Sequence, residues 1–210
     1  MKAYQIKVTL LDVEPPVWRQ FIVPAGISFE RLHAVIQLAM GWRDCHLYEF
    51  VFDSGGLKVT GDEEEVEEYR YYQTPEGKKA LKAMQRMAMS LQLPAEVLLA
   101  EETEIDELLE KQRKFTYSYD FGDGWEHSVE LTQVLEAYIG PPKVVGFEGQ
   151  CPPEDCGGPG GYEEFVTAWN DPSHTDHESV REWGEGQCYG EYDIDDVNEQ
   201  MEYVLEEESE

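Results

Sequence analysis

Alternating apolar and polar residues between Phe115 and Leu131 form the clearest structural pattern in the chain. Aromatic residues occupy every second position from 115 to 121, and Trp, His, Val and Leu occupy every second position from 125 to 131. This period is typical of half-buried strands. Gly122-Asp123-Gly124 supplies turn-forming residues between the two runs. We predict a β-hairpin with a three-residue loop, which pairs Phe121 with Trp125 and directs both to the core.

The same patterns predict the remaining elements. A helix is expected between Ser28, a favourable N-cap, and Gly41, a favourable C-terminal stop. Short helices are expected near 162–169 and 194–205, whereas 133–149 is expected to be irregular. Further strands are predicted at 3–10, 17–23, 46–52 and 57–60.

The stretch 61–112 is expected to be an acidic helical insertion between strands. We expect an exposed loop over 61–68, a helix over 76–91 and another helical stretch from 94 to 111. The whole pattern predicts an α+β fold. Residues 1–206 form a single compact domain, in which a mixed, mostly antiparallel sheet of about five strands packs with helices. We expect residues 207–210 to form a frayed acidic tail, because glutamates oppose the dipole at a helix C-terminus.

The net charge of the chain limits its possible binding partners. The chain of 210 residues has 45 acidic and 16 basic residues, for a formal net charge of -29. Such a surface repels phosphate backbones and anionic membranes, so direct nucleic-acid binding and membrane association are not expected. It favours cations or basic proteins, although solubility alone also explains it. The first residues alternate like a strand, and we expect a cytoplasmic protein without a signal peptide.

Two cysteines and two histidines form a possible metal-ligand set. Cys151 and Cys156 lie in a stretch rich in proline and glycine, and His174 and His177 follow three residues apart. Zinc readily accepts thiolate and imidazole ligands, and a site with all four would be structural because its coordination shell is closed. The alternative is a loop shaped by its prolines and glycines, in which the cysteines pack as small apolar groups.

Acidic residues gather at the predicted hairpin end and in the cysteine-containing loop. The predicted register places Asp120 opposite Glu126, with Asp123 at the tip, and like charges placed opposite each other are unfavourable. A solvated hairpin end is one explanation; a bound cation or a basic protein partner is the other. The binding hypothesis assigns this role to Asp120, Asp123, Glu126, Glu154 and Asp155.

Few catalytic patterns are present. The chain has no Walker loop, no dinucleotide-binding glycine pattern and no GxSxG elbow. His46 and His127 would serve as general acid or base only in a cleft. The predicted register places His127 on the apolar face, which favours a hydrogen-bonded core histidine. A metal-dependent hydrolase built from the carboxylates remains a catalytic alternative.

Four motifs resemble one known family. They are PPVWR (15–19), YDFGDGWEH (119–127), CPPEDCGGPGGY (151–162) and DPSHTDH (171–177). Together they resemble the Ri-plasmid open-reading-frame-three family, whose members are also labelled TnpR-type passenger proteins of insertion elements. The resemblance spans nearly the whole chain and implies a compact α+β fold with a mixed sheet. It implies no assigned catalytic residues.

The TnpR label is that of a resolvase, and the sequence does not support a resolvase activity. A serine recombinase needs a nucleophilic serine beside several arginines, and a basic DNA-binding segment, whereas this chain has neither an arginine cluster nor a basic tail. We therefore expect a non-catalytic binding or interaction module of a plasmid- and mobile-element-associated family. The alternatives are a zinc-binding metalloprotein, a metal-dependent hydrolase or DNA-processing enzyme, and a mimic of DNA.

Overall fold

A computed structural model describes residues 1–52, 56–87 and 96–206 of the chain. The predicted tail at 207–210 and the end of the predicted helix over 76–91 lie outside the described residues. In chain order the elements are β1 (Ala3–Leu10), β2 (Trp18–Pro24), α1 (Phe29–Met40), β3 (Tyr48–Phe52), β4 (Leu57–Thr60), α2 (Glu63–Gln73), α3 (Pro75–Met87), β5 (Val97–Leu99), α4 (Ile105–Gln112), β6 (Lys114–Tyr119), β7 (Trp125–Leu135), β8 (Lys143–Glu148), α5 (Gly158–Asn170), α6 (His177–Gly186) and α7 (Ile194–Met201).

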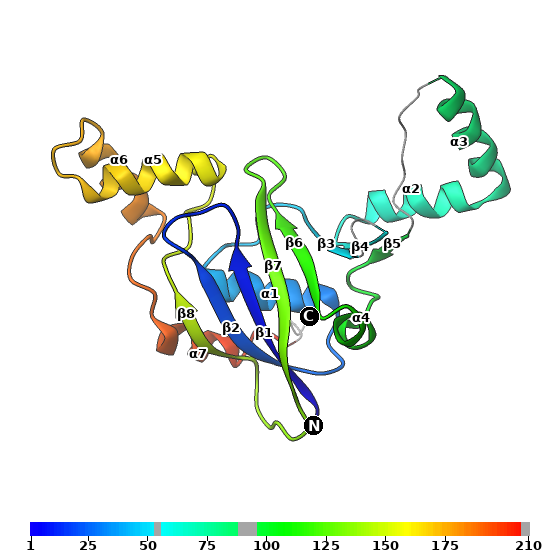
Figure 1. The fold of residues 1–210 in the computed structure, drawn as a ribbon, viewed down its shortest axis with the longest axis horizontal. Helices are drawn as coiled ribbons and strands as arrows, with labels where there is room; N and C mark the ends of the chain where they lie inside the picture. The colour runs from blue at the N-terminus through cyan, green and yellow to red at the C-terminus, as the bar shows by residue number, and fades with distance from the viewer. Residues whose placement is uncertain (53–55, 88–95, 207–210) are drawn as a thin grey trace.

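One eight-stranded sheet organises this α+β domain, in the order β5-β4-β3-β6-β7-β1-β2-β8 (Figure 1). All neighbours are antiparallel except β4 and β5, which are parallel, so the mixed, mostly antiparallel sheet is confirmed. The predicted number of about five strands was wrong. The chain adds β5 at one edge of the sheet and β8 at the other.

Tertiary contacts explain why β8 was not predicted. The stretch was expected to be irregular, because Val144 is its only fully buried residue. Its strand conformation depends on pairing with β2. The side chain of Asn198 on α7 also donates to the carbonyl of Val144 and accepts from its amide. Such partners are remote in sequence and leave no local periodicity.

Two predictions for the acidic stretch were wrong. β5 lies where a helix was expected, because a three-residue apolar run does not distinguish strand from helix, and pairing with β4 decides its conformation. Residues 61–68 were expected to form a loop, but α2 begins at Glu63. The Asp62 side chain caps this helix by accepting from the amides of Glu64 and Glu65. Carboxylates are favourable at a helix N-terminus, so this acidic run starts a helix.

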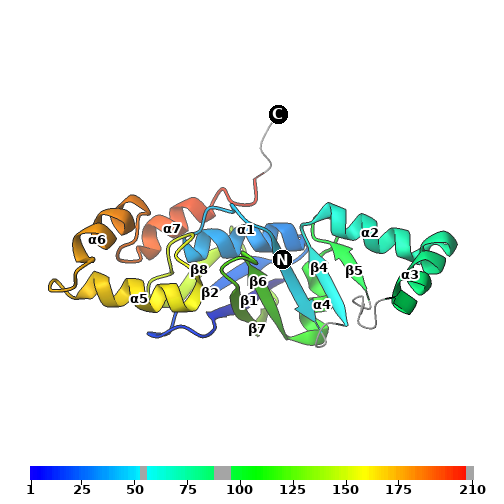
Figure 2. The ribbon, with the colours of Figure 1, turned by 90° about the horizontal axis from the view of Figure 1, so that it is seen from above.

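Helix α1 covers one face of the sheet, as Figures 1 and 2 show. Its predicted limits are confirmed, since the Ser28 side chain accepts from the amide of Arg31, and Gly41 ends the helix with a φ of 94°. Helix α7 contacts α1, while α5 and α6 lie at one end of the molecule and α2 and α3 at the other (Figure 2). No helix within the described ranges has both the length and the apolar character needed to span a membrane.

The β6–β7 hairpin has the predicted faces but not the predicted loop. Tyr119 pairs with Trp125, so five residues, 120 to 124, connect the strands. The shift of two residues preserves the inward face. It leaves Phe121, expected in the core, 53% exposed. It also places Glu126 opposite Ser118 instead of Asp120.

Asp120 determines the longer loop. Its backbone is left-handed, with a φ of 53°. Its carboxylate accepts from the amides of Gly122 and Asp123, and its carbonyl accepts from the amide of Gly124 at 2.6 Å. Asp tolerates this conformation better than most residues because its side chain bonds locally. The turn therefore starts two residues before the glycine-rich stretch, and Asp120 is 6% exposed.

Candidate metal centre

The hairpin tip contacts the loop that precedes α5. The Asp123 carboxylate accepts from the amide of Gly157 at 3.0 Å. Gly158 has a φ of +71°, and a Cβ added there would lie 2.4 Å from the carbonyl oxygen of Asp123. Only glycine permits so close an approach in this backbone conformation. The contact brings the acidic end of the hairpin beside the acidic part of the loop.

Three carboxylates from these two segments surround the imidazole of His46, just before β3. His46 Nε2 lies 3.6 Å from Asp120 Oδ2, 3.9 Å from Glu154 Oε2 and 3.3 Å from Asp155 Oδ1. It forms a properly aligned hydrogen bond with none of them. Ligand atoms of His46, Asp120 and Asp155 lie close to one another, whereas Glu154 approaches this group at His46.

Glu154 is the most constrained member of this cluster. Its residue is 7% exposed. Oε1 accepts from the amide of Arg43 at 2.8 Å and from the hydroxyl of Tyr119 at 3.0 Å. Burial raises the pKa of Tyr119 well above its usual value, so this hydroxyl stays protonated and donates. Oε2 has no hydrogen-bond partner among the described residues and faces His46.

The separations match those between ligands on one metal ion. With bonds of about 2.1 Å, neighbouring ligand atoms of a tetrahedral zinc site lie about 3.4 Å apart. The His46 nitrogen has separations of 3.3, 3.6 and 3.9 Å to the three carboxylate oxygens. One ligand atom each from His46, Asp120 and Asp155 lies within 4.8 Å of the others, and no other such group of three occurs in the described ranges.

The core of the domain holds the loop in place. Trp42, which follows the C-terminus of α1, donates from its indole nitrogen to the carbonyl of Pro152 at 3.0 Å. Its ring lies 4.9 Å from that of Tyr119, centroid to centroid. Both residues are buried. Glu154 therefore projects from a loop anchored to α1 and to β6, whereas the Asp155 side chain is 72% exposed and leaves the cluster open on one side.

The structure gathers only part of the predicted acidic set. Asp120, Glu154 and Asp155 lie together around His46. The Asp123 carboxylate instead accepts a hydrogen bond from the amide of Gly157. The exposed Glu126 lies on β7, away from this cluster. The predicted opposition of Asp120 and Glu126 was wrong, because the loop is two residues longer than expected.

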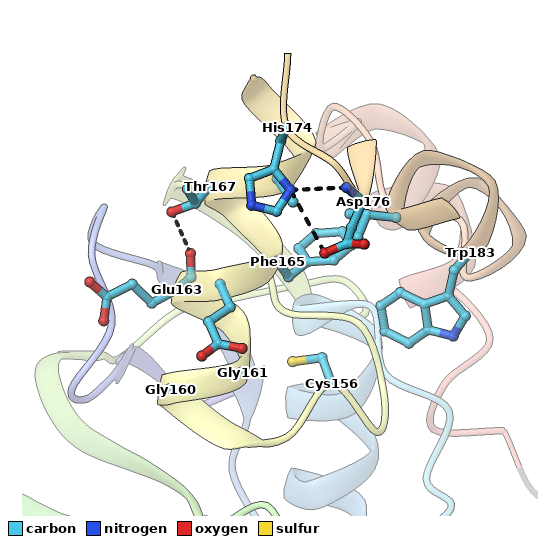
Figure 3. A pocket seen from close by; sticks show the side chains of 12 residues that line it. Cys156, Gly160, Gly161, Glu163, Phe165, Thr167, His174, Asp176 and Trp183 are labelled. Atoms are coloured by element: carbon cyan, nitrogen blue, oxygen red, sulfur yellow. Dashed lines mark hydrogen bonds and ion pairs between the residues drawn. The ribbon is translucent and has the colours of Figure 1, made fainter. Parts of the chain in front are cut away.

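The cysteine and histidine set does not converge. No three of Cys151, Cys156, His174 and His177 have ligand atoms within 4.8 Å of one another. Cys156 and His174 line a cavity of about 880 Å³ beside α5, where Figure 3 shows them at opposite ends. The His177 ring donates to the carbonyl of Ala168, and His174 Nδ1 accepts from the amide of Asp176.

All four cysteines are free thiols. Burial raises the pKa of Cys156 to about 12 and that of Cys151 further. Both residues are protonated at neutral pH and half-buried against the apolar core. This environment is that of small packed thiols, the alternative that the sequence left open.

His46 was proposed from the sequence as an acid or base but not as a ligand. Its role follows from the pairing of β3 with β6, in which Tyr48 lies opposite Tyr119. Extending this antiparallel register beyond the strand ends brings His46 beside the hairpin loop. The available signal was a histidine at the start of a predicted strand, but the neighbouring strand had to be known to place this histidine beside the hairpin loop.

His127 is a core residue, as predicted. It is fully buried, and its Nδ1 donates to the carbonyl of Tyr117 at 3.1 Å. Burial lowers its pKa to about 4, so the imidazole is neutral at pH 7. It lies in the sheet core and not in the cluster around His46.

We expect His127 to make the fold sensitive to mild acid. Its pKa is about 4 in the folded chain and about 6.5 in the unfolded chain. The unfolded chain thus binds the proton first as the pH falls, so this contribution is complete above about pH 6.5 and lost towards pH 4. Between pH 7.5 and 5.0 the loss is about 2 kcal/mol in the free energy of unfolding.

Urea unfolding at these two pH values, compared between the wild type and His127→Gln, measures this contribution. The wild type should lose about 2 kcal/mol more than the variant. The other histidines and the carboxylates are present in both proteins, so their titration cancels. An identical pH dependence in the two proteins would contradict the buried, neutral state of His127.

Together, the fold and the site define an α+β domain with a histidine–carboxylate cluster between a hairpin tip and a loop. Comparison with known proteins places this class in a family. The chain belongs to the plasmid pRiA4b ORF-3-like protein family, which it matches over residues 2–201. This assignment confirms the family resemblance that the four sequence motifs indicated.

Two relatives support this placement. The chain is 37% identical over 181 residues to "Uncharacterized protein y4hQ" of Sinorhizobium fredii, covering 85% of this chain and 79% of that protein. It is also similar to the crystal structure of "Protein of Unknown Function MM3350" from Methanosarcina mazei Go1. That similarity has a TM-score of 0.69 and 26% identity and covers 93% of this chain and 97% of the other. Neither name assigns an activity, so function rests on the site itself.

Proposed function

We propose that this protein is a non-catalytic binding module that holds a divalent cation between His46, Asp120 and Asp155, beside the buried carboxylate of Glu154. The observation that carries the proposal is the unpaired Glu154 Oε2, 3.9 Å from His46 Nε2. A buried carboxylate oxygen without a partner is unfavourable. A cation at this site would compensate this charge and that of Asp120, which is also buried.

The ligand chemistry favours a transition-metal ion. Imidazole suits zinc and related ions, whereas magnesium and calcium prefer oxygen ligands alone. Zinc therefore remains the expected ion, on a different ligand set from the cysteines and histidines. The exposed Asp155 and the net charge of -29 also support a basic protein surface as a partner at the open side of the site.

Calorimetric titration of protein freed of metal by chelator tests the proposal. We expect one equivalent of Zn²⁺ to bind, Mn²⁺ to bind more weakly and Mg²⁺ weakest. Glu154→Gln retains an acceptor for Arg43 and Tyr119 but loses the charge, and should weaken Zn²⁺ binding about 100-fold. Glu126→Gln removes an exposed acid from the same hairpin and serves as the matched control, with unchanged affinity.

Two results would contradict this function. One is the absence of stoichiometric binding for all three ions. The other is loss of zinc binding in Cys156→Ala combined with unchanged binding in Glu154→Gln, which would assign the ion to the thiols. Unfolding of the metal-free variants identifies any that fail to fold, and Glu154→Gln is expected to be as stable as the wild type without metal, because it removes a charge from the crowded cluster.

A further inference from the structure

A second cavity lies behind the loop that carries Glu154. It has a volume of about 210 Å³ and is bounded by the C-terminal end of α1, residues 150–154 and residues 187–197. This volume is about that of seven molecules of liquid water. Arg19, from β2, lines this cavity although its residue is 0% exposed.

The guanidinium of Arg19 is only partly satisfied. Nε donates to the carbonyl of Ala39 at 2.9 Å, and Nη1 donates to the carbonyls of Trp18 and Glu148 at 2.9 Å each. Nη2 forms no well-aligned hydrogen bond within the described ranges. Burial lowers the pKa of Arg19, but arginine retains its proton in proteins.

No carboxylate of the described residues forms an ion pair with Arg19, although acids far outnumber bases in this chain. A buried cation without a counter-ion is costly, and this cost is commonly offset by a paired anion. The three backbone carbonyls supply only partial negative charge. Arg19 is thus a buried positive charge without a carboxylate partner, and the residue lines a cavity.

Tyr192 provides a second donor in the same lining. Its ring centroid lies 3.9 Å from the guanidinium carbon of Arg19. Its hydroxyl is buried and forms no well-aligned hydrogen bond among the described residues, but it interacts with the guanidinium of Arg19. Burial raises the pKa of Tyr192 to about 12, so the hydroxyl keeps its proton at neutral pH. In this contact the Tyr192 oxygen is the acceptor, so its O–H proton and the Arg19 charge together complement a carboxylate.

We propose that this cavity binds the carboxylate of a small zwitterionic molecule of amino-acid size, through Arg19 Nη2 and the hydroxyl of Tyr192. The opposite end of the bound molecule would lie at the rim of the cavity, where Glu191, Asp193 and Asp196 are exposed. These acids disfavour a multiply charged anion and attract an ammonium group. They outnumber the one basic residue of the rim, Arg43.

This site is separate from the cation centre. Neither Arg19 nor Tyr192 contributes a ligand to the cluster around His46, so the small-molecule proposal holds whether or not a metal binds there. Glu154 lines the cavity from the same loop, but its Oε1 already accepts from the amide of Arg43 and the hydroxyl of Tyr119.

Calorimetric titration with three molecules of equal chain length tests the proposal: γ-aminobutyrate, butyrate and butylamine. We expect γ-aminobutyrate to bind most tightly, butyrate more weakly and butylamine without saturation. Tyr192→Phe keeps the ring over Arg19 and removes only the hydroxyl, and should weaken γ-aminobutyrate about tenfold. Asp196→Asn should reduce the preference of the protein for γ-aminobutyrate over butyrate.

Tyr203→Phe, at a tyrosine that is 61% exposed, is the matched control and should bind as the wild type does. The proposal is overturned if Tyr192→Phe binds γ-aminobutyrate as tightly as the wild type. It is also overturned if butylamine binds as tightly as γ-aminobutyrate, or if neither carboxylate shows saturable binding up to about 10 mM.

Discussion

Replacing Phe115 by alanine is expected to destabilise the domain by about 4 kcal/mol, whereas Phe121→Ala should cost less than about 1 kcal/mol. Phe115 is 6% exposed, and its ring lies within 6.3 Å of those of Phe29, Phe50 and Phe52. Truncation removes these contacts and leaves a cavity. Phe121 is 53% exposed in the five-residue loop, so its truncation removes little buried surface.

This pair of variants distinguishes the two hairpin registers. Both positions have the same residue type in the same hairpin, so the difference between them reports burial alone. The three-residue loop would bury both rings and predicts similar costs. Urea unfolding gives the two free energies, and Phe115→Leu, with an expected cost of about 1 kcal/mol, provides a milder measurement if the alanine variant does not fold. Equal effects at 115 and 121 would refute the register described here.

Gly158→Ala should destabilise the domain by about 3 kcal/mol, the second largest effect. A left-handed backbone costs an alanine about 1–2 kcal/mol. The added Cβ would also meet the carbonyl oxygen of Asp123 at 2.4 Å, a separation that requires the loop or the hairpin tip to move. Since this contact joins the two segments that carry the carboxylates, zinc affinity should fall together with stability.

Gly160→Ala is the matched control within the first turn of α5. A Cβ at Gly160 would have no atom within 4 Å, and this position requires no left-handed backbone. Alanine is there expected to be neutral or to stabilise the helix by up to about 1 kcal/mol. Thermal and urea unfolding of both variants measure the contrast. Similar stability in the two would show that the hairpin tip and the loop do not depend on this contact.

Local periodicity accounts for what could be predicted of the fold. The inward positions of the hairpin followed from a period of two, and the limits of α1 followed from Ser28 and Gly41, because faces and caps depend on neighbours in sequence. The number of strands did not follow. β5 and β8 each exist through pairing with a strand already in the sheet, and their own residues alternate weakly.

The candidate site, like the fold, could be predicted only in part. The motifs indicated Asp120, Glu154 and Asp155 as a possible cation site, since they are acidic residues at turn positions. The set of Cys151, Cys156, His174 and His177 was considered because thiolate and imidazole are zinc ligands, but Cys156 and His174 lie on opposite sides of α5 in the chain. A helix of 13 residues, α5, lies between them, and its length of about 20 Å separates segments that spacing alone would bring together.

The amino-acid sequence by itself determined the α+β class, the family, the inward faces of the hairpin and the acidic character of its tip, because each depends on composition or on local pattern. Only the tertiary structure decided which side chains share a site. The pairing of β3 with β6 brings His46 to Asp120, and the contact of Gly158 with Asp123 brings Glu154 to both. Burial then leaves one oxygen of Glu154 and one nitrogen of Arg19 without partners. Those two atoms, which no sequence pattern marks, carry the functional proposals, because an unpaired polar group removed from water is stable only with a partner.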